Sequence, residues 1–99
     1  NENVKKILNK MLNNVKIKLE EDKKIKLEIS DNVQQIIFEE VTKDLSMGGR
    51  GIGNKLELLF INPLAELLFK LFPQEGSIVR VDRLLKREDR WELDGRVVS

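Results

Sequence analysis

The sequence contains no cysteine and no histidine. Without cysteine the chain cannot form disulfides or thiolate metal sites, and without histidine it lacks the commonest metal ligand and acid–base group. Ser30, Ser46 and Ser77 therefore have no histidine to act as a base, and the acidic residues lie mostly in segments of mixed charge. We expect no self-contained active site, no metal site and, by default, a cytoplasmic location.

Long apolar runs and an excess of one charge are also missing. No apolar run reaches the roughly 18 to 20 residues that a membrane span needs. The 18 Lys and Arg nearly cancel the 17 Asp and Glu, which leaves a formal net charge of +1. These features predict neither a membrane nor a nucleic-acid partner. The 99 residues suffice for a single domain, 1–99, with a modest core, and the start without Met or signal peptide suggests a fragment of a longer chain.

A first amphipathic helix is predicted from Asn3 to about Asp22. Its apolar residues recur at steps of three and four, as expected for one face of a helix. They are Val4, Ile7, Leu8, Met11, Leu12, Val15 and Leu19. Lysines fill many of the polar positions, which is compatible with a nucleic-acid-binding face. No aromatic residue interleaves them and three acidic residues follow at once, so we favour a solvated helix face.

A short strand and a second helix follow. Residues Ile25 to Ile29 alternate between apolar and charged side chains, the pattern of a half-buried strand. Ser30 and Asp31 supply N-cap chemistry, and Gln34 lies three residues after Asp31, the spacing of a capping box. A second helix is therefore predicted from Asp31 to about Asp44.

A glycine-rich stretch, Met47 to Asn54, surrounds Arg50 and leads into the longest apolar periodic segment. Glycine permits close backbone approach, so such a loop at a helix start can place amides and a cation at a phosphate. Taken alone, the spacing fits a simple connection between helices better than it fits a phosphate-binding loop. Further along, Asn62 and Pro63 predict a kink or a restart of the helix.

The segment from Ile52 to Phe72 has one apolar stripe that we expect to face the core. Its members are Ile52, Leu56, Leu59, Phe60, Pro63, Leu64, Leu67, Leu68, Leu71 and Phe72. Leu58, Ile61 and Phe69 lie off this stripe, so the helix has more apolar surface than a small domain can cover. A partner is expected there. The same surface would suit a non-enzymatic adaptor that presents the apolar helix 52–72 to another protein.

The C-terminal part predicts a β-hairpin, with strands at Ser77 to Asp82 and Arg90 to Asp94. Trp91 is interpreted as a core or sheet-edge residue. Asp94-Gly95 is predicted to turn the chain, and the tail from Arg96 is expected to be irregular. The expected fold class is α+β, in which three helices, the last long and kinked, pack around a small two- to three-stranded sheet.

Two motifs in fixed register carry a family resemblance. Gly48-Gly49-Arg50-Gly51-Ile52 is followed, twelve residues after the arginine, by Asn62-Pro63-Leu64-Ala65. Together with the flanking helices and strands, they resemble the C-terminal small, or lid, subdomain of Clp/ClpB-type AAA+ unfoldases. The chain departs from the family pattern where Gly49 replaces the usual alanine and Gly51 replaces a proline.

The resemblance implies a fold of the AAA+ lid type and a lid that closes over ATP, with Mg-ATP bound mainly by a large subdomain outside this sequence. It assigns Arg50 as the sensor 2 arginine, the implied catalytic residue, and Gly48, Gly49, Arg50 and Gly51 as the implied nucleotide-binding residues. The implied partners are the large AAA+ subdomain of the same chain, neighbouring subunits of a hexameric ring, and protein substrates that the ATPase unfolds. The fragment alone has no phosphate-cradling loop or magnesium-binding acid, so hydrolysis would belong to the longer chain.

Overall fold

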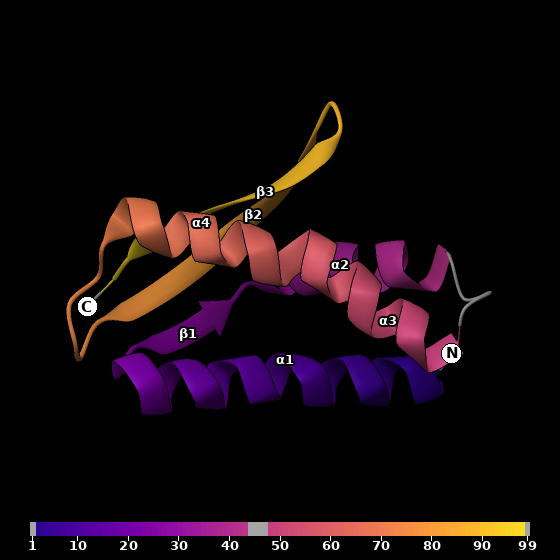
Figure 1. The fold of residues 1–99 in the computed structure, drawn as a ribbon, viewed down its shortest axis with the longest axis horizontal. Coiled ribbons are helices and arrows are strands. Elements are labelled where there is room, and N and C mark those ends of the chain that lie inside the picture. Colours follow the sequence, from indigo (N-terminus) through magenta and orange to yellow (C-terminus); the bar gives the residue numbers. More distant parts are fainter. Residues whose placement is uncertain (1, 44–47, 99) are drawn as a thin grey trace.

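Helices and strands alternate in the computed structural model, which describes residues 2–43 and 48–98, and only the backbone of Glu2 and of residues 48–50. The elements are α1 (Glu2–Lys23), β1 (Lys26–Ile29), α2 (Asp31–Lys43), α3 (Gly48–Leu56), η1 (Glu57–Ile61, a π-helical turn), α4 (Asn62–Leu71), β2 (Ile78–Arg87) and β3 (Arg90–Val97). Figure 1 shows that α3, η1 and α4 form one long helical run. The predicted α+β class with three helical segments is confirmed.

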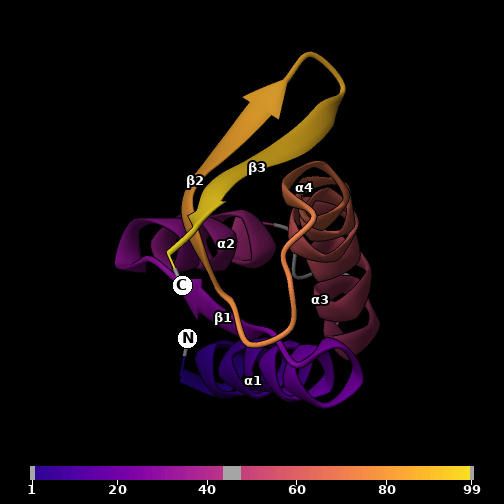
Figure 2. The same ribbon diagram turned by 90° about the vertical axis from the view of Figure 1, so that its left-hand side faces the viewer.

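The sheet has the order β1-β2-β3 and is mixed. β1 pairs parallel with β2 because the helices between them carry the chain back across the sheet, whereas β2 and β3 form an antiparallel hairpin. α2 packs on β2, while η1 and α4 pack on β3 and α1 packs on β1. Figure 2 shows the helices grouped around the base of the sheet, with the far end of the hairpin projecting beyond them.

One hydrophobic core joins all these elements. Its most deeply buried side chains belong to α2, η1 and β2: Val33, Ile37, Val41, Leu59, Phe60, Val79 and Val81. β1 alternates as the sequence predicts, with Leu27 and Ile29 buried and Lys26 and Glu28 exposed. Within the described part of the chain, no helix has the length and apolar character needed to cross a membrane.

The start of α2 differs from the predicted capping box. Ser30, rather than Asp31, is the cap: its Oγ accepts a hydrogen bond from the Val33 amide at 3.3 Å. The same hydroxyl donates to the Asp82 carbonyl at 3.3 Å, and so ties the helix start to β2. Gln34 reaches back to the Ile29 carbonyl with its Nε2 at 3.0 Å. The cap therefore depends on β2, a partner that the local sequence could not reveal.

The long helix passes Asn62 and Pro63 without ending. The Asn62 amide donates to the Glu57 carbonyl five residues earlier, the hydrogen bond of a π-helix, and the residues on both sides keep right-handed helical dihedral angles. Proline has no amide hydrogen and its ring crowds the carbonyl four residues before it. The widened turn makes room for the ring, so the predicted interruption takes the form of a π-turn, with Pro63 near the start of α4.

The hairpin is longer than predicted. β2 continues to Arg87 and β3 runs from Arg90 through Val97, so the chain turns at 88–89. The predictions of a turn at Asp94-Gly95 and of an irregular tail from Arg96 are wrong. The ladder holds an irregularity between Val81 and Arg83, typical of a bulge, and Gly95 faces Val81 there. A Cβ on Gly95 would collide with the Arg80 carbonyl and lie 3.1 Å from Leu67 Cδ2, so this glycine serves close packing rather than a turn.

We expect Gly95→Ala to destabilise the chain by about 1 to 3 kcal/mol, because the added methyl group must displace a backbone carbonyl. Urea unfolding followed by Trp91 fluorescence and circular dichroism measures the change. Gly53→Ala is the matched control. Among the described residues, a Cβ on Gly53 would meet only Met11 Cε, at 3.9 Å, so alanine should stabilise α3 by about 0.5 to 1 kcal/mol. Equal effects at both positions would contradict the assigned role of Gly95.

Candidate functional site

The glycine-rich stretch around Arg50 is helical. Gly48 is the first residue of α3, and Arg50 lies in its first turn. The prediction that Met47 to Asn54 is a loop connecting helices is therefore wrong for residues 48–54. The start of this stretch and the predicted end of the second helix near Asp44 fall in 44–47, outside the described residues. The candidate nucleotide-binding residues Gly48, Gly49, Arg50 and Gly51 form the N-terminal end of a helix.

Packing explains why so many glycines remain helical. Each glycine weakens a helix by about 1 kcal/mol relative to alanine, so intrinsic propensity opposes α3. Ile52 and Leu56, one helical turn apart, are only 3% and 2% exposed and belong to the core. Gly51 is itself buried, and α3 contacts both α1 and α2. Tertiary burial thus outweighs propensity and holds the backbone of Arg50 on a helix fixed to the core.

The side chain of Arg50 lies outside the described residues, so its predicted approach to a nucleotide remains a prediction. Close in sequence, Lys43 donates to Glu40 Oε2 at 2.7 Å and lowers the pKa of that carboxyl, while Glu40 raises the pKa of Lys43. Both groups already carry their charges at neutral pH, and the pair supports the end of α2 rather than acid–base chemistry. Within the described residues, no group of three or more acidic side chains could hold a metal ion.

A second candidate feature is an exposed apolar stripe on the outer face of η1 and α4. It consists of Leu58, Ile61, Ala65, Phe69 and Phe72, and we call it the outer stripe. Leu58 lies beside the far end of the hairpin, in a hollow with Pro63 and Trp91. Ala65, Phe69 and Phe72 line a second hollow, beside Lys23 and Ile25. Leu58 is 61% exposed, Ile61 38% and Phe69 81%. The prediction that this chain leaves these three side chains uncovered is confirmed.

Phe72 belongs to this exposed surface, although the sequence predicts it on the core-facing stripe. It is 82% exposed and has a left-handed backbone, with φ 49° and ψ 54°. α4 ends at Leu71, and the Phe72 amide donates to the Leu68 carbonyl at 2.9 Å as a C-cap. The reversal of φ turns the side chain away from the core. Pro73, which cannot continue a helix, was the only local sign of this ending.

Most of the chain matches a known family. The model of the C-terminal, D2-small domain of ClpB protein matches residues 1–81. The chain belongs to this family. A search among curated proteins found no match. The domain is thus the small, or lid, subdomain of a Clp-type AAA+ chaperone, and the family implies that the longer chain binds ATP.

Family membership explains the uncovered stripe in general terms, because a D2-small domain is part of a larger AAA+ chain of a kind that typically forms oligomers. Large exposed apolar side chains gathered along one helical run indicate an interaction surface rather than scattered surface residues. In this chain the outer stripe extends about two helical turns from Ala65 in each direction, to Leu58 and to Phe72. Side chains on this face should therefore contribute little to the stability of the domain by itself.

Adjacent leucines test this separation of roles. Leu59 is fully buried, so Leu59→Ala should lower the free energy of unfolding by about 2 to 5 kcal/mol. Leu58→Ala, at the neighbouring exposed position, should change it by no more than about 0.5 kcal/mol. Urea unfolding of both variants of the 99-residue chain provides the comparison. A large loss at Leu58 would mean that the outer stripe stabilises the domain itself.

Proposed function

We propose that this domain is the nucleotide-sensing lid of a Clp-type AAA+ unfoldase and that Arg50 is its sensor 2 arginine. The proposed arginine contacts the phosphates of ATP held by the large subdomain and couples hydrolysis to movement of the lid. Arginine suits this role because its planar guanidinium can bind two phosphate oxygens and stabilise charge that develops during phosphoryl transfer. The whole chain, 1–99, acts as one domain of a longer cytoplasmic protein in this proposal.

The observation that carries the proposal is the position of Arg50 in the first turn of α3. The free amides and the dipole at a helix N-terminus favour an anionic group, and an arginine in this turn adds a positive charge close to the same place. Burial of Ile52 and Leu56 fixes the helix to the core. A movement of the lid would therefore move the backbone of Arg50 with it, as coupling to hydrolysis requires.

The outer stripe supplies the second part of the proposed function. We assign it to contacts with the large subdomain of the same chain and with a neighbouring subunit of a hexameric ring. Burying a phenylalanine or leucine side chain contributes about 1.5 to 3 kcal/mol, so the strongly exposed Leu58, Phe69 and Phe72 offer a substantial stabilisation to an assembly. Protein substrates would be unfolded by the assembled ring and not by this domain alone.

In the longer ATPase chain, Arg50→Ala should reduce ATP turnover or weaken nucleotide binding roughly 10- to 100-fold, the loss expected for a hydrogen bond to a charged group. Steady-state hydrolysis and binding of a fluorescent ATP analogue measure the two effects. Lys55→Ala removes a positive charge from the last turn of the same helix and serves as the control. Unchanged turnover and affinity in Arg50→Ala, with the fold intact, would remove the assignment and favour the adaptor function, which needs no arginine at this position.

Charge introduced into the outer stripe should impair assembly. We expect Leu58→Glu and Phe69→Glu in the longer chain to lower the fraction of hexamer in sedimentation experiments and to reduce ATP turnover with it, because a buried unpaired carboxylate is costly. Ile17→Glu changes an exposed apolar residue, 46% exposed, on the other side of the domain at α1. It should leave assembly unchanged. Normal assembly of both stripe variants would exclude the stripe from the subunit interface.

A further inference from the structure

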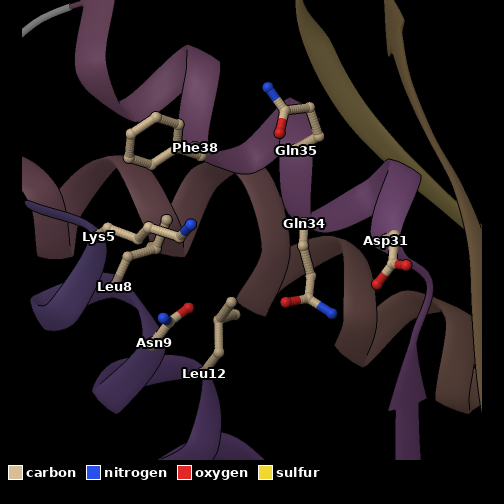
Figure 3. A pocket seen from close by; sticks show the side chains of 8 residues that line it. All are labelled: Lys5, Leu8, Asn9, Leu12, Asp31, Gln34, Gln35 and Phe38. Carbon is tan, nitrogen blue, oxygen red and sulfur yellow. The ribbon is translucent and has the colours of Figure 1, made fainter. Parts of the chain in front are cut away.

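A groove that takes no part in the proposed lid function runs between α1 and α2. Two hollows, of about 390 and 490 Å³, share Asn9, Leu12 and Gln34 and so adjoin each other; together they are called the α1–α2 groove. Its floor is apolar, because Leu8, Leu12 and Ile29 are buried there and Phe38 is half-buried. Figure 3 shows the first hollow, with α1 and α2 on its two sides.

Side-chain amides line both walls of the groove. Asn9 and Asn13 lie one helical turn apart on α1, and Gln34 faces them from α2. Figure 3 shows the amides of Asn9 and Gln34 directed into the space between the helices. Asn9 and Asn13 make no side-chain hydrogen bond within the described part of the chain. Gln34 donates its Nε2 to the Ile29 carbonyl at 3.0 Å, which fixes the amide and leaves its oxygen available as an acceptor.

The spacing of these amides matches an extended peptide. Residues four apart on a helix are separated by about 6 Å along its axis, and alternate residues of an extended strand are about 6.6 to 6.8 Å apart. An asparagine amide has N–H donors and an acceptor oxygen, so it can donate to the C=O and accept from the N–H of the same backbone residue. Asn9 and Asn13 can therefore bind alternate residues of the same strand. From Lys5 to Lys16 the groove spans about 16 Å, enough for about five extended residues.

The lysines that line the groove favour an acidic peptide. Lys5, Lys10 and Lys16 line the two hollows, against a single acidic residue, Asp31. None of these three lysines makes an ion pair with another described residue. The groove therefore carries an excess of positive charge. Nucleic acid fits less well, because single strands bind largely by stacking on exposed aromatic side chains, and the one aromatic residue lining the two hollows, Phe38, lies half-buried at the floor.

We propose that the α1–α2 groove binds a short, extended, acidic peptide segment of another protein. The asparagine pair on α1 and Gln34 on α2 bind the peptide backbone, the half-buried Phe38 contacts its apolar side chains, and the lysines pair with its carboxylates. Alternation of acidic and apolar residues suits this arrangement, because successive side chains of an extended strand point to opposite sides. A partner protein would thereby reach the lid at a surface distinct from both the Arg50 helix and the outer stripe.

The probe for this proposal is a fluorescein-labelled pentapeptide of alternating glutamate and leucine, titrated with the 99-residue chain and followed by fluorescence anisotropy. We expect saturable binding that weakens with salt. The Asn9→Ala/Asn13→Ala double variant should raise the Kd at least tenfold, as should Lys10→Glu/Lys16→Glu. Asn14→Ala and Lys18→Glu change the same residue types at exposed α1 positions outside the groove, and each should alter the Kd less than twofold. Alanine favours helix, so the asparagine variants should keep the circular dichroism of the parent chain.

The outcomes separate the proposal from its alternatives. The proposal is supported if the glutamate peptide binds more tightly than a peptide in which lysine replaces glutamate. This preference should be lost in the groove variants and kept in the two control variants. Absence of saturable binding overturns the proposal. Equal losses in groove and control variants also overturn it, because they would indicate general attraction to the lysines of α1. If a labelled oligothymidine competes with the glutamate peptide and binds at least as tightly, the groove is a nucleic-acid-binding site and the peptide proposal is wrong.

Discussion

The long helical run is buried on one side at its π-turn, and this burial fixes the positions of α3 and α4 on either side of the turn. Leu59 and Phe60 are adjacent in sequence and both fully buried, and the wider turn places them together against the core. α3 extends from one side of this anchor toward Arg50, and α4 extends from the other beneath the hairpin. The same anchoring leaves Leu58 and Ile61 facing outward. The position of the candidate arginine and the orientation of the outer stripe are therefore two consequences of one packing arrangement.

Much of the fold could be predicted because it is encoded by local periodicity. Apolar spacings of three and four identify α1 and α2, and strict alternation identifies β1. The errors occur where distant packing decides. The four glycines between residues 48 and 53 indicate a turn by propensity, but burial of Ile52 and Leu56 makes the segment helical. Gly95 similarly looks like a turn residue, yet it is needed where β3 passes close to the Arg80 carbonyl.

The candidate site was only partly accessible from sequence. The fixed distance between its motif and Asn62-Pro63 predicts Arg50 as a site residue, and this role stays a prediction. Periodicity identified the outward-facing Leu58, Ile61 and Phe69. Phe72 was assigned to the wrong face because Phe72 itself takes a left-handed backbone conformation at the end of α4. The path of the chain that follows determines this conformation. The amides of the α1–α2 groove carry no sequence signal of their own, since Asn9 and Gln34 become neighbours only when α1 and α2 pack.

The hairpin shows why the domain cannot be divided where the family match ends. The match reaches Val81, which is also where the ladder irregularity begins. Beyond it, Leu84 and Leu93 are only 5% and 3% exposed, and β3 packs against both η1 and α4. Removing these strands would uncover the face of the sheet that anchors the long helical run. Leu84 and Leu93, which follow Val81, therefore share one hydrophobic core with the residues that the family model matches.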